Sequence, residues 1–210
     1  MTRSHRLVVV LLLNVVLVTA LVAVGLAAHS LAVLAAGADY LADAAAIGVS
    51  LLAIWLAAKP PSQARPHGYP AATNVAALVN AGWLFVLNIL IATAAIYRLV
   101  GGARQVDGLP VLIVSGTAAV VMLIGALVLG GGADDDGGEE DLNIRAVLLD
   151  TAADAAAAAG VAVSGAIILA TDGWYWLDPA AALIIAVIVG YHAAKLLQKI
   201  AAALRVAGAA

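Results

Sequence analysis

Two pairs of aspartates interrupt an otherwise apolar sequence, and both pairs have the same spacing. Asp39 and Asp43 form one pair, and Asp150 and Asp154 form the other. A helix turns about 100° per residue, so residues four apart lie on one face, about 6 Å apart along the axis. Both carboxylates of a pair therefore point the same way. Carboxylate oxygens bind zinc, manganese, magnesium and calcium, so these four residues are the candidate ligands of a divalent metal ion.

The apolar surroundings of these acids indicate that they have a function. An ionised aspartate in the middle of a bilayer costs at least about 2.5–3.5 kcal/mol, and such a residue marks a functional site by default. The alternative is that the acids pair with basic residues in the membrane or cap helix ends. No lysine or arginine falls in the middle of an apolar segment, which disfavours that alternative.

Four carboxylates around one divalent ion also predict an exchange with protons. Four negative charges exceed the charge of the ion, so some of the carboxyl groups are expected to be protonated and to titrate together. Arrival of the metal would then displace protons. A site that holds either metal or protons predicts a proton-coupled antiporter, with rocking helices opening the site to each side in turn.

Composition predicts an integral membrane protein of the all-α class. The chain has 210 residues, of which 65% are hydrophobic and 11% charged, and its mean hydropathy is +1.08. Soluble domains are roughly 45–50% apolar. The abundance of Ala, Val, Leu and Gly favours helices over a membrane barrel. The absence of cysteine excludes disulfides and thiolate ligands, and the net charge of −3 gives no indication of a nucleic-acid partner.

Six apolar segments are long enough to cross about 30 Å of hydrocarbon, which takes about 20 residues. They predict a bundle of six transmembrane helices in a single transmembrane domain, residues 1–210, with helices near residues 6–28, 30–58, 75–100, 109–129, 144–170 and 179–204.

Basic residues predict the orientation of the chain, because cytoplasmic loops are enriched in lysine and arginine. With both termini in the cytoplasm, Arg98 and Arg104 lie outside. The cytoplasmic side then holds the others, namely Arg3, Arg6, Lys59, Arg65, Arg145, Lys195, Lys199 and Arg205. We expect a multi-pass protein of the cell inner (plasma) membrane. In this orientation Asp39 reaches the depth of Asp154 and Asp43 that of Asp150, so antiparallel helices would bring all four together.

Several fragments of the sequence resemble the cation diffusion facilitator family, whose members are six-helix, proton-coupled exporters of divalent transition metals. In chain order these fragments are SLAVLAAGADYLAD (30–43), RPHGYP (65–70), ALVNA (77–81), DLNIRAVLLDTAAD (141–154) and GWYWLDP (173–179). The similarity covers nearly the whole chain. It implies that Asp39, Asp43, Asp150 and Asp154 are the transport ligands, and that the protein needs no cofactor besides the metal it carries.

Two departures from the family pattern affect the prediction. Zinc-type members usually carry histidine at the position of Asp150, and an all-carboxylate site shifts the preference toward harder ions such as manganese or iron. Zinc is still the first choice, with manganese, iron, cobalt and cadmium as alternatives. The chain also ends just after the last apolar segment, so we expect a short form that lacks the family's cytoplasmic C-terminal domain. Any homodimer would be held by the membrane domain.

Other functions are less well supported by the sequence. No phosphate loop or nucleophile with its base is present, so we expect no enzyme. The alternative function is proton-coupled efflux of small organic cations, which would favour aromatic walls, and Phe85 is the only phenylalanine.

Some polar residues are assigned lesser roles. The acidic stretch from Asp134 to Asp141 suggests a solvated linker or a funnel that attracts cations. His67 is expected on the surface, and His29 and His192 at the membrane interfaces. Asp178, before Pro179, is expected to cap the last helix.

Overall fold

The described part of the chain is entirely helical. The computed structural model describes residues 3–57, 72–130 and 139–207; within them, the side chains of residues 3–14, 72–77, 128–130, 139–150, 203–207 and most of 43–57 lie outside the description. Six α-helices and no strand occur in these ranges, so the predicted all-α fold is confirmed. The helices are α1 (Arg3–Ala27), α2 (Leu31–Ala57), α3 (Ala72–Gly101), α4 (Gly108–Gly130), α5 (Glu139–Thr171) and α6 (Leu177–Ala207).

Helix length and hydropathy agree with a membrane location. Among the described residues, the stretches long and apolar enough to cross a bilayer are Leu78–Gly101, Gly108–Leu127, Thr151–Thr171 and Leu177–Ala202. The described apolar parts of α1 and α2, Val15–Ala27 and Leu31–Ala42, are shorter. Large apolar side chains such as Leu90 and Ile113 are exposed. Lipid would cover these side chains, and the helices satisfy their own backbone hydrogen bonds, as the bilayer interior requires.

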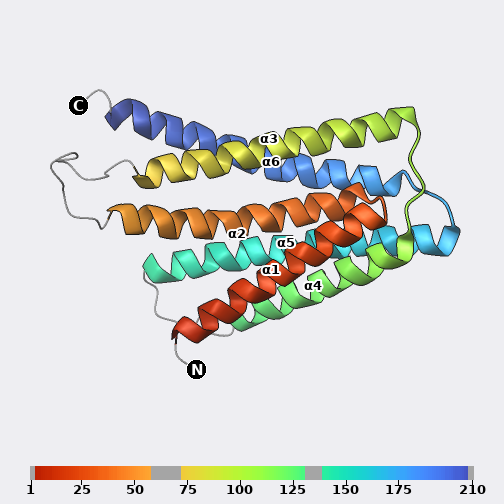
Figure 1. Ribbon diagram of the computed structural model, residues 1–210, viewed down its shortest axis with the longest axis horizontal. Coiled ribbons are helices and arrows are strands. Elements are labelled where there is room, and N and C mark those ends of the chain that lie inside the picture. Colours follow the sequence, from red (N-terminus) through yellow and green to blue (C-terminus); the bar gives the residue numbers. More distant parts are fainter. Residues whose placement is uncertain (1–2, 58–71, 131–138, 208–210) are drawn as a thin grey trace.

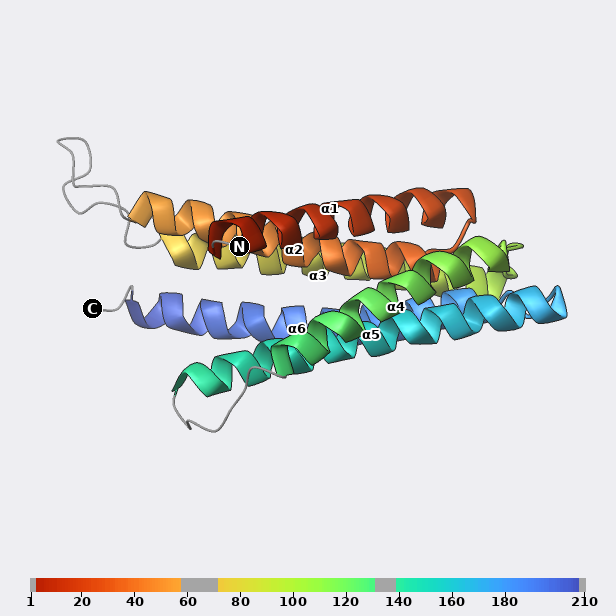
Figure 2. The ribbon, with the colours of Figure 1, turned by 90° about the horizontal axis from the view of Figure 1, so that it is seen from below.

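The six helices run along the long axis of the molecule, and their packing is uneven (Figures 1 and 2). The closest pairs are α4 with α5 and α3 with α6. α2 lies in the middle of the bundle and packs against α1, α3 and α6, but it meets α5 over only a short stretch. The helix pair that carries Asp154 is therefore separate, over much of its length, from the helix that carries Asp39.

Two glycines explain the close approach of α4 and α5. A Cβ atom added to Gly108 would lie 2.6 Å from the carbonyl oxygen of Gly165, and a Cβ added to Gly165 would lie 2.8 Å from the backbone nitrogen of Leu112. Such distances are too short for any side chain. The two backbones are in direct contact here, which is the packing that small residues permit between membrane helices.

A single buried carboxylate joins the first turns of α2 and α6. Asp178 is fully buried, and it accepts hydrogen bonds from the backbone N–H groups of Leu31 (2.7 Å) and Ala32 (3.3 Å) and from the hydroxyl of Ser30 (2.5 Å). The Ser30 hydroxyl oxygen accepts a bond from the N–H of Val33 (3.1 Å). The N–H groups of residues 31, 32 and 33, which have no partner within a helix, are all satisfied in this way.

Asp178 thus differs from its predicted role. α6 begins one residue earlier, at Leu177, and the hydrogen bonds described for the Asp178 carboxylate go to the start of α2, a helix far away in the sequence. Arg98, near the end of α3, completes the cluster. Its guanidinium donates to the carbonyl of His29 (2.7 Å) and lies 3.9 Å from the Asp178 carboxylate. Three helices are therefore held at a common level at this end of the bundle.

We expect Asp178→Ala to destabilise the protein strongly. The substitution leaves two buried N–H groups of α2 without an acceptor, which lowers the free energy of unfolding by about 1–3 kcal/mol for each group. It also removes the carboxylate that lies beside Arg98. Thermal unfolding in detergent would show a large fall in Tm. Asp107→Ala is the matched control, because Asp107 is exposed at the start of α4 and accepts one long bond of 3.4 Å from Leu109. Equal stability of the two variants would contradict this account.

Gly165→Val should separate α4 from α5, because its side chain has no room beside the backbone of α4. We expect less folded protein and a lower Tm. Gly116→Val provides the control on α4, since a Cβ atom there meets no atom within 4 Å. Comparable yield and Tm for both variants would show that the close approach of the two helices is not required.

Candidate functional site

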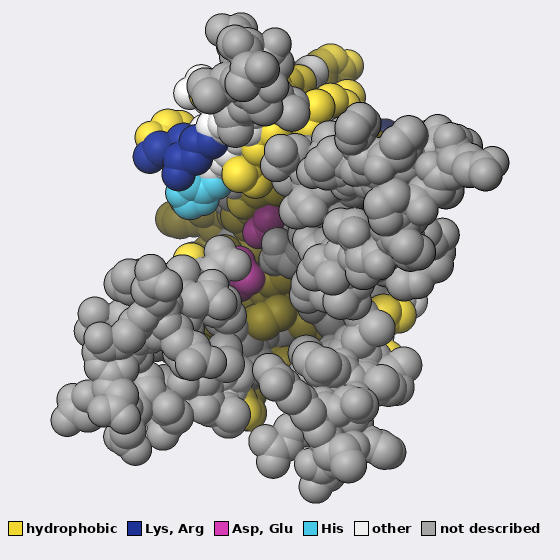
Figure 3. Space-filling model, turned by 90° about the vertical axis from the view of Figure 1, so that its left-hand side faces the viewer, with side chains coloured by type: hydrophobic (Ala, Val, Ile, Leu, Met, Phe, Trp, Pro, Cys, Tyr) yellow, Lys and Arg dark blue, Asp and Glu magenta, His cyan; other side chains and the backbone are white. Residues whose placement is uncertain are grey.

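Asp39 on α2 and Asp154 on α5 line the same cavity. Its volume is about 770 Å³, and its walls come from α2, α3, α5 and α6. Both carboxylate residues are partly buried. They are distant in the sequence, and they come to one cavity because α2 and α5 run in opposite directions through the bundle. Figure 3 looks along the bundle from the side on which α2 ends and α3 begins, and it shows acidic side chains next to hydrophobic ones.

A direct hydrogen bond fixes the level at which α2 and α5 meet. The hydroxyl of Tyr40, a residue that is 2% exposed, donates to the backbone carbonyl of Asp154 at 3.3 Å. Tyr40 directly follows Asp39 in the chain, so its side chain connects α2 to the α5 backbone at Asp154. Residue counting predicted one depth for Asp39 and Asp154; their role as metal ligands stays a prediction.

The other two predicted ligands lie outside the described side chains. Asp43 and Asp150 are residues of α2 and α5, one helical turn from Asp39 and Asp154, and they remain predictions. Within the part of the chain whose side chains are described, no group of three or more His, Cys, Asp or Glu is arranged to hold one metal ion. His67 and residues 134–138 of the acidic stretch also fall outside the description, whereas Glu139–Asp141 form the start of α5 with side chains that are not described.

Most of the cavity wall is aliphatic, and α6 supplies much of it. Its lining residues follow a helical stripe, namely Ala181, Ile184, Ile185, Ile188, Val189, His192, Ala193 and Leu196. His192 is therefore a lining residue of the cavity, whereas the sequence suggested only an interfacial position. The sequence does contain a signal for this position: His192 lies four residues from both Ile188 and Leu196, and therefore on the same face of α6. Asn80 on α3 is the remaining polar residue of the wall.

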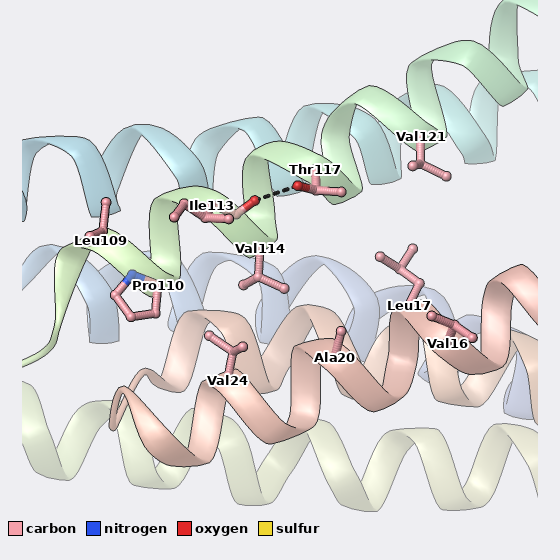
Figure 4. Close-up of a pocket in the computed structure, with 10 residues that line it drawn as sticks. All are labelled: Val16, Leu17, Ala20, Val24, Leu109, Pro110, Ile113, Val114, Thr117 and Val121. Carbon is pink, nitrogen blue, oxygen red and sulfur yellow. Dashed lines mark hydrogen bonds between the residues drawn. The ribbon is translucent and has the colours of Figure 1, made fainter.

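A second hollow, between α1 and α4, lacks chemistry suited to a cation (Figure 4). Its volume is about 560 Å³ and its lining is aliphatic except for Thr117. The Thr117 hydroxyl donates to the carbonyl of Ile113, in its own helix, at 2.8 Å. The cavity that holds Asp39 and Asp154 is therefore the candidate site.

Ionisable residues among helices long and apolar enough to cross a membrane commonly mark an ion pathway. The family comparison agrees. The model of the cation efflux transmembrane domain matches residues 7–204, and the chain belongs to this family, the cation diffusion facilitators. The resemblance drawn from the sequence fragments is thereby confirmed.

Curated relatives share this region. The zinc transporter ZitB of Yersinia pseudotuberculosis is 28% identical over 94% of this chain and 62% of its own length. The cadmium, cobalt and zinc/H(+)-K(+) antiporter of Bacillus velezensis is 31% identical over 89% of this chain and 60% of its own length. The human proton-coupled zinc antiporter SLC30A2 is 28% identical over 79% of this chain and 46% of its own length. The matched region thus spans less than two thirds of each relative.

Proposed function

We propose that this protein is a proton-coupled antiporter that exports a divalent transition-metal cation from the cytoplasm through Asp39, Asp43, Asp150 and Asp154. The observation that carries the proposal is the presence of Asp39 and Asp154, from two antiparallel helices, at one cavity of the membrane bundle. Asp43 and Asp150 follow at one turn along the same helices. Two helices thus offer two carboxylates each to one ion.

The chemistry of carboxylates connects metal binding to proton movement. Several carboxylates close together in an apolar cavity repel one another when ionised, which favours protonation of some of them. A divalent ion that replaces these protons removes the repulsion and gains hard oxygen ligands. Binding of metal and binding of protons are therefore mutually exclusive. This is the requirement for exchange of the two across a membrane.

The names of the relatives support zinc as the first candidate ion. Zinc appears in the names of the Yersinia, Bacillus and human proteins, and protons appear in the last two. An oxygen-only ligand set also suits manganese, iron, cobalt or cadmium. The proposal places the protein in the cell inner membrane with both termini in the cytoplasm, as the distribution of lysine and arginine predicts. A homodimer, if formed, would use the membrane helices.

Asp39→Asn and Asp154→Asn should each abolish transport, since an amide cannot replace the charge of the carboxylate. We expect zinc flux into proteoliposomes under a proton gradient to fall by at least about tenfold. Loss of a group that only orients a metal ligand already lowers metal affinity or activity about 10–100-fold. Proton release on addition of zinc to the purified protein should fall with it.

Asp172→Asn serves as the control for this experiment. Asp172 is exposed in the turn between α5 and α6 and has a positive φ, which asparagine tolerates. Normal zinc flux in both Asp39→Asn and Asp154→Asn would refute the assignment of the site.

A second function, efflux of small organic cations, is favoured by the size of the cavity. A volume of about 770 Å³ exceeds the needs of one metal ion and falls within the range of about 300–1,000 Å³ of small-molecule pockets. Gly160→Leu separates the two functions, because Gly160 lines the cavity and a Cβ atom there meets no atom within 4 Å. The leucine would fill space that an organic cation needs. If the variant still transports metal and amines do not compete with the metal for transport, metal export is supported. If the variant loses transport of amines, efflux of organic cations is supported.

A further inference from the structure

The polar groups of the cavity wall lie at different depths. Besides Asp39 and Asp154, the wall contains only Asn80 and His192 as polar residues among the described side chains. The rest of the wall is aliphatic side chains and one glycine. An ion that enters a largely apolar space loses water, and it is stabilised only where polar groups replace that water.

The contacts of Asp178 set the depth of His192 relative to Asp39. Because Asp178 bonds to the N–H groups of Leu31 and Ala32, α2 and α6 begin at one level and run in the same direction. At 1.5 Å per residue, Asp39 lies about 12 Å from Leu31, and His192 lies about 21 Å from Asp178. His192 is therefore about 9 Å nearer than Asp39 to the end of the bundle that carries the α2–α3 connection.

Asn80 lies farther along the same direction. A Cβ atom added to Gly190 on α6 would lie 3.5 Å from the Cβ of Asn88 on α3, so these two residues share a level. Asn80 is two turns from Asn88, about 12 Å closer to the same end of the bundle. Among the described polar groups, the order from this end inward is thus Asn80, His192 and Asp39. By the same count Asp43, one turn beyond Asp39 on α2, comes within about 3 Å of the level of His192.

We propose that His192 is a transient metal ligand between the cytoplasmic mouth of the cavity and the level of Asp39 and Asp154, and that it favours zinc-like ions over harder ones. This inference rests on the proposed function. His192 lies about 9 Å in depth from Asp39, so an ion entering from this end meets His192 before it reaches Asp39 and Asp154. Its imidazole nitrogen suits zinc, cobalt and cadmium better than manganese. His192 thereby supplies a nitrogen ligand on a path whose carboxylates supply oxygen ligands.

The test measures the initial rate of zinc transport in proteoliposomes for His192→Ala, with Gln198→Ala as the control. Gln198 is exposed on the same helix and does not line the cavity. We expect His192→Ala to raise the KM for zinc about tenfold, which is the size of affinity loss found when a group near a metal site is removed. The maximal rate should change little, because the aspartates are intact. His192→Cys, which supplies a thiolate ligand, should restore a low KM for cadmium.

Asp154→Asn, measured in parallel, separates failure of this inference from failure of the proposed function. An unchanged KM in His192→Ala, with transport abolished in Asp154→Asn, overturns the role of His192 alone. Normal transport in Asp154→Asn overturns the proposed function itself. A lower maximal rate of His192→Ala at unchanged KM also overturns the inference, because it indicates an effect on structure or protons.

A labelling experiment tests the same inference without transport. The chain contains no cysteine, so His192→Cys and Gln198→Cys each introduce a single thiol. We expect cadmium to slow the reaction of a membrane-impermeant maleimide with the thiol at position 192 and to leave the reaction at position 198 unchanged. Equal labelling of position 192 with and without cadmium overturns the inference.

Discussion

The buried carboxylate of Asp178 determines how the central helices are aligned. It accepts bonds from the first N–H groups of α2 while it belongs to the first turn of α6, and Arg98 of α3 lies beside it. Buried N–H groups require acceptors, so the starts of α2 and α6 cannot slide past each other without a large loss of stability. The depth of every side chain on these two helices follows from that alignment, including Asp39 and His192.

The cavity forms where the packing changes from one helix pair to another. α4 and α5 touch backbone to backbone at Gly108 and Gly165, and α3 and α6 form the other close pair. α5 contributes Asp154, whose carbonyl accepts a bond from Tyr40 of α2, and the contact between these two helices is short. The space left between the pairs is lined by α2, α3, α5 and α6 and contains the acids of α2 and α5. Close packing elsewhere in the bundle therefore coexists with a hollow at the candidate site.

The sequence predicted features that follow from apolar length and residue spacing, and it missed two contacts that depend on how particular helices pack. Apolar length predicts the membrane helices, and the four-residue spacing of the acids with a count of depth predicts that Asp39 and Asp154 reach one level. The partner of Asp178 could not be predicted, because a carboxylate before a proline usually serves its own helix. The apolar stripe of α6 contains His192, but the stripe does not say which neighbouring helices or cavity it faces. That depends on the packing of α6 against α2 and α3.

The direct backbone contact of α4 with α5 has a mechanical consequence. At Gly108 and Gly165 the backbones of α4 and α5 touch, and the side chain of Val111 packs beside them. Close-packed interiors have low compressibility and transmit strain. We therefore expect a displacement of α5 to be transmitted to α4, whereas α5 shares only a short contact with α2.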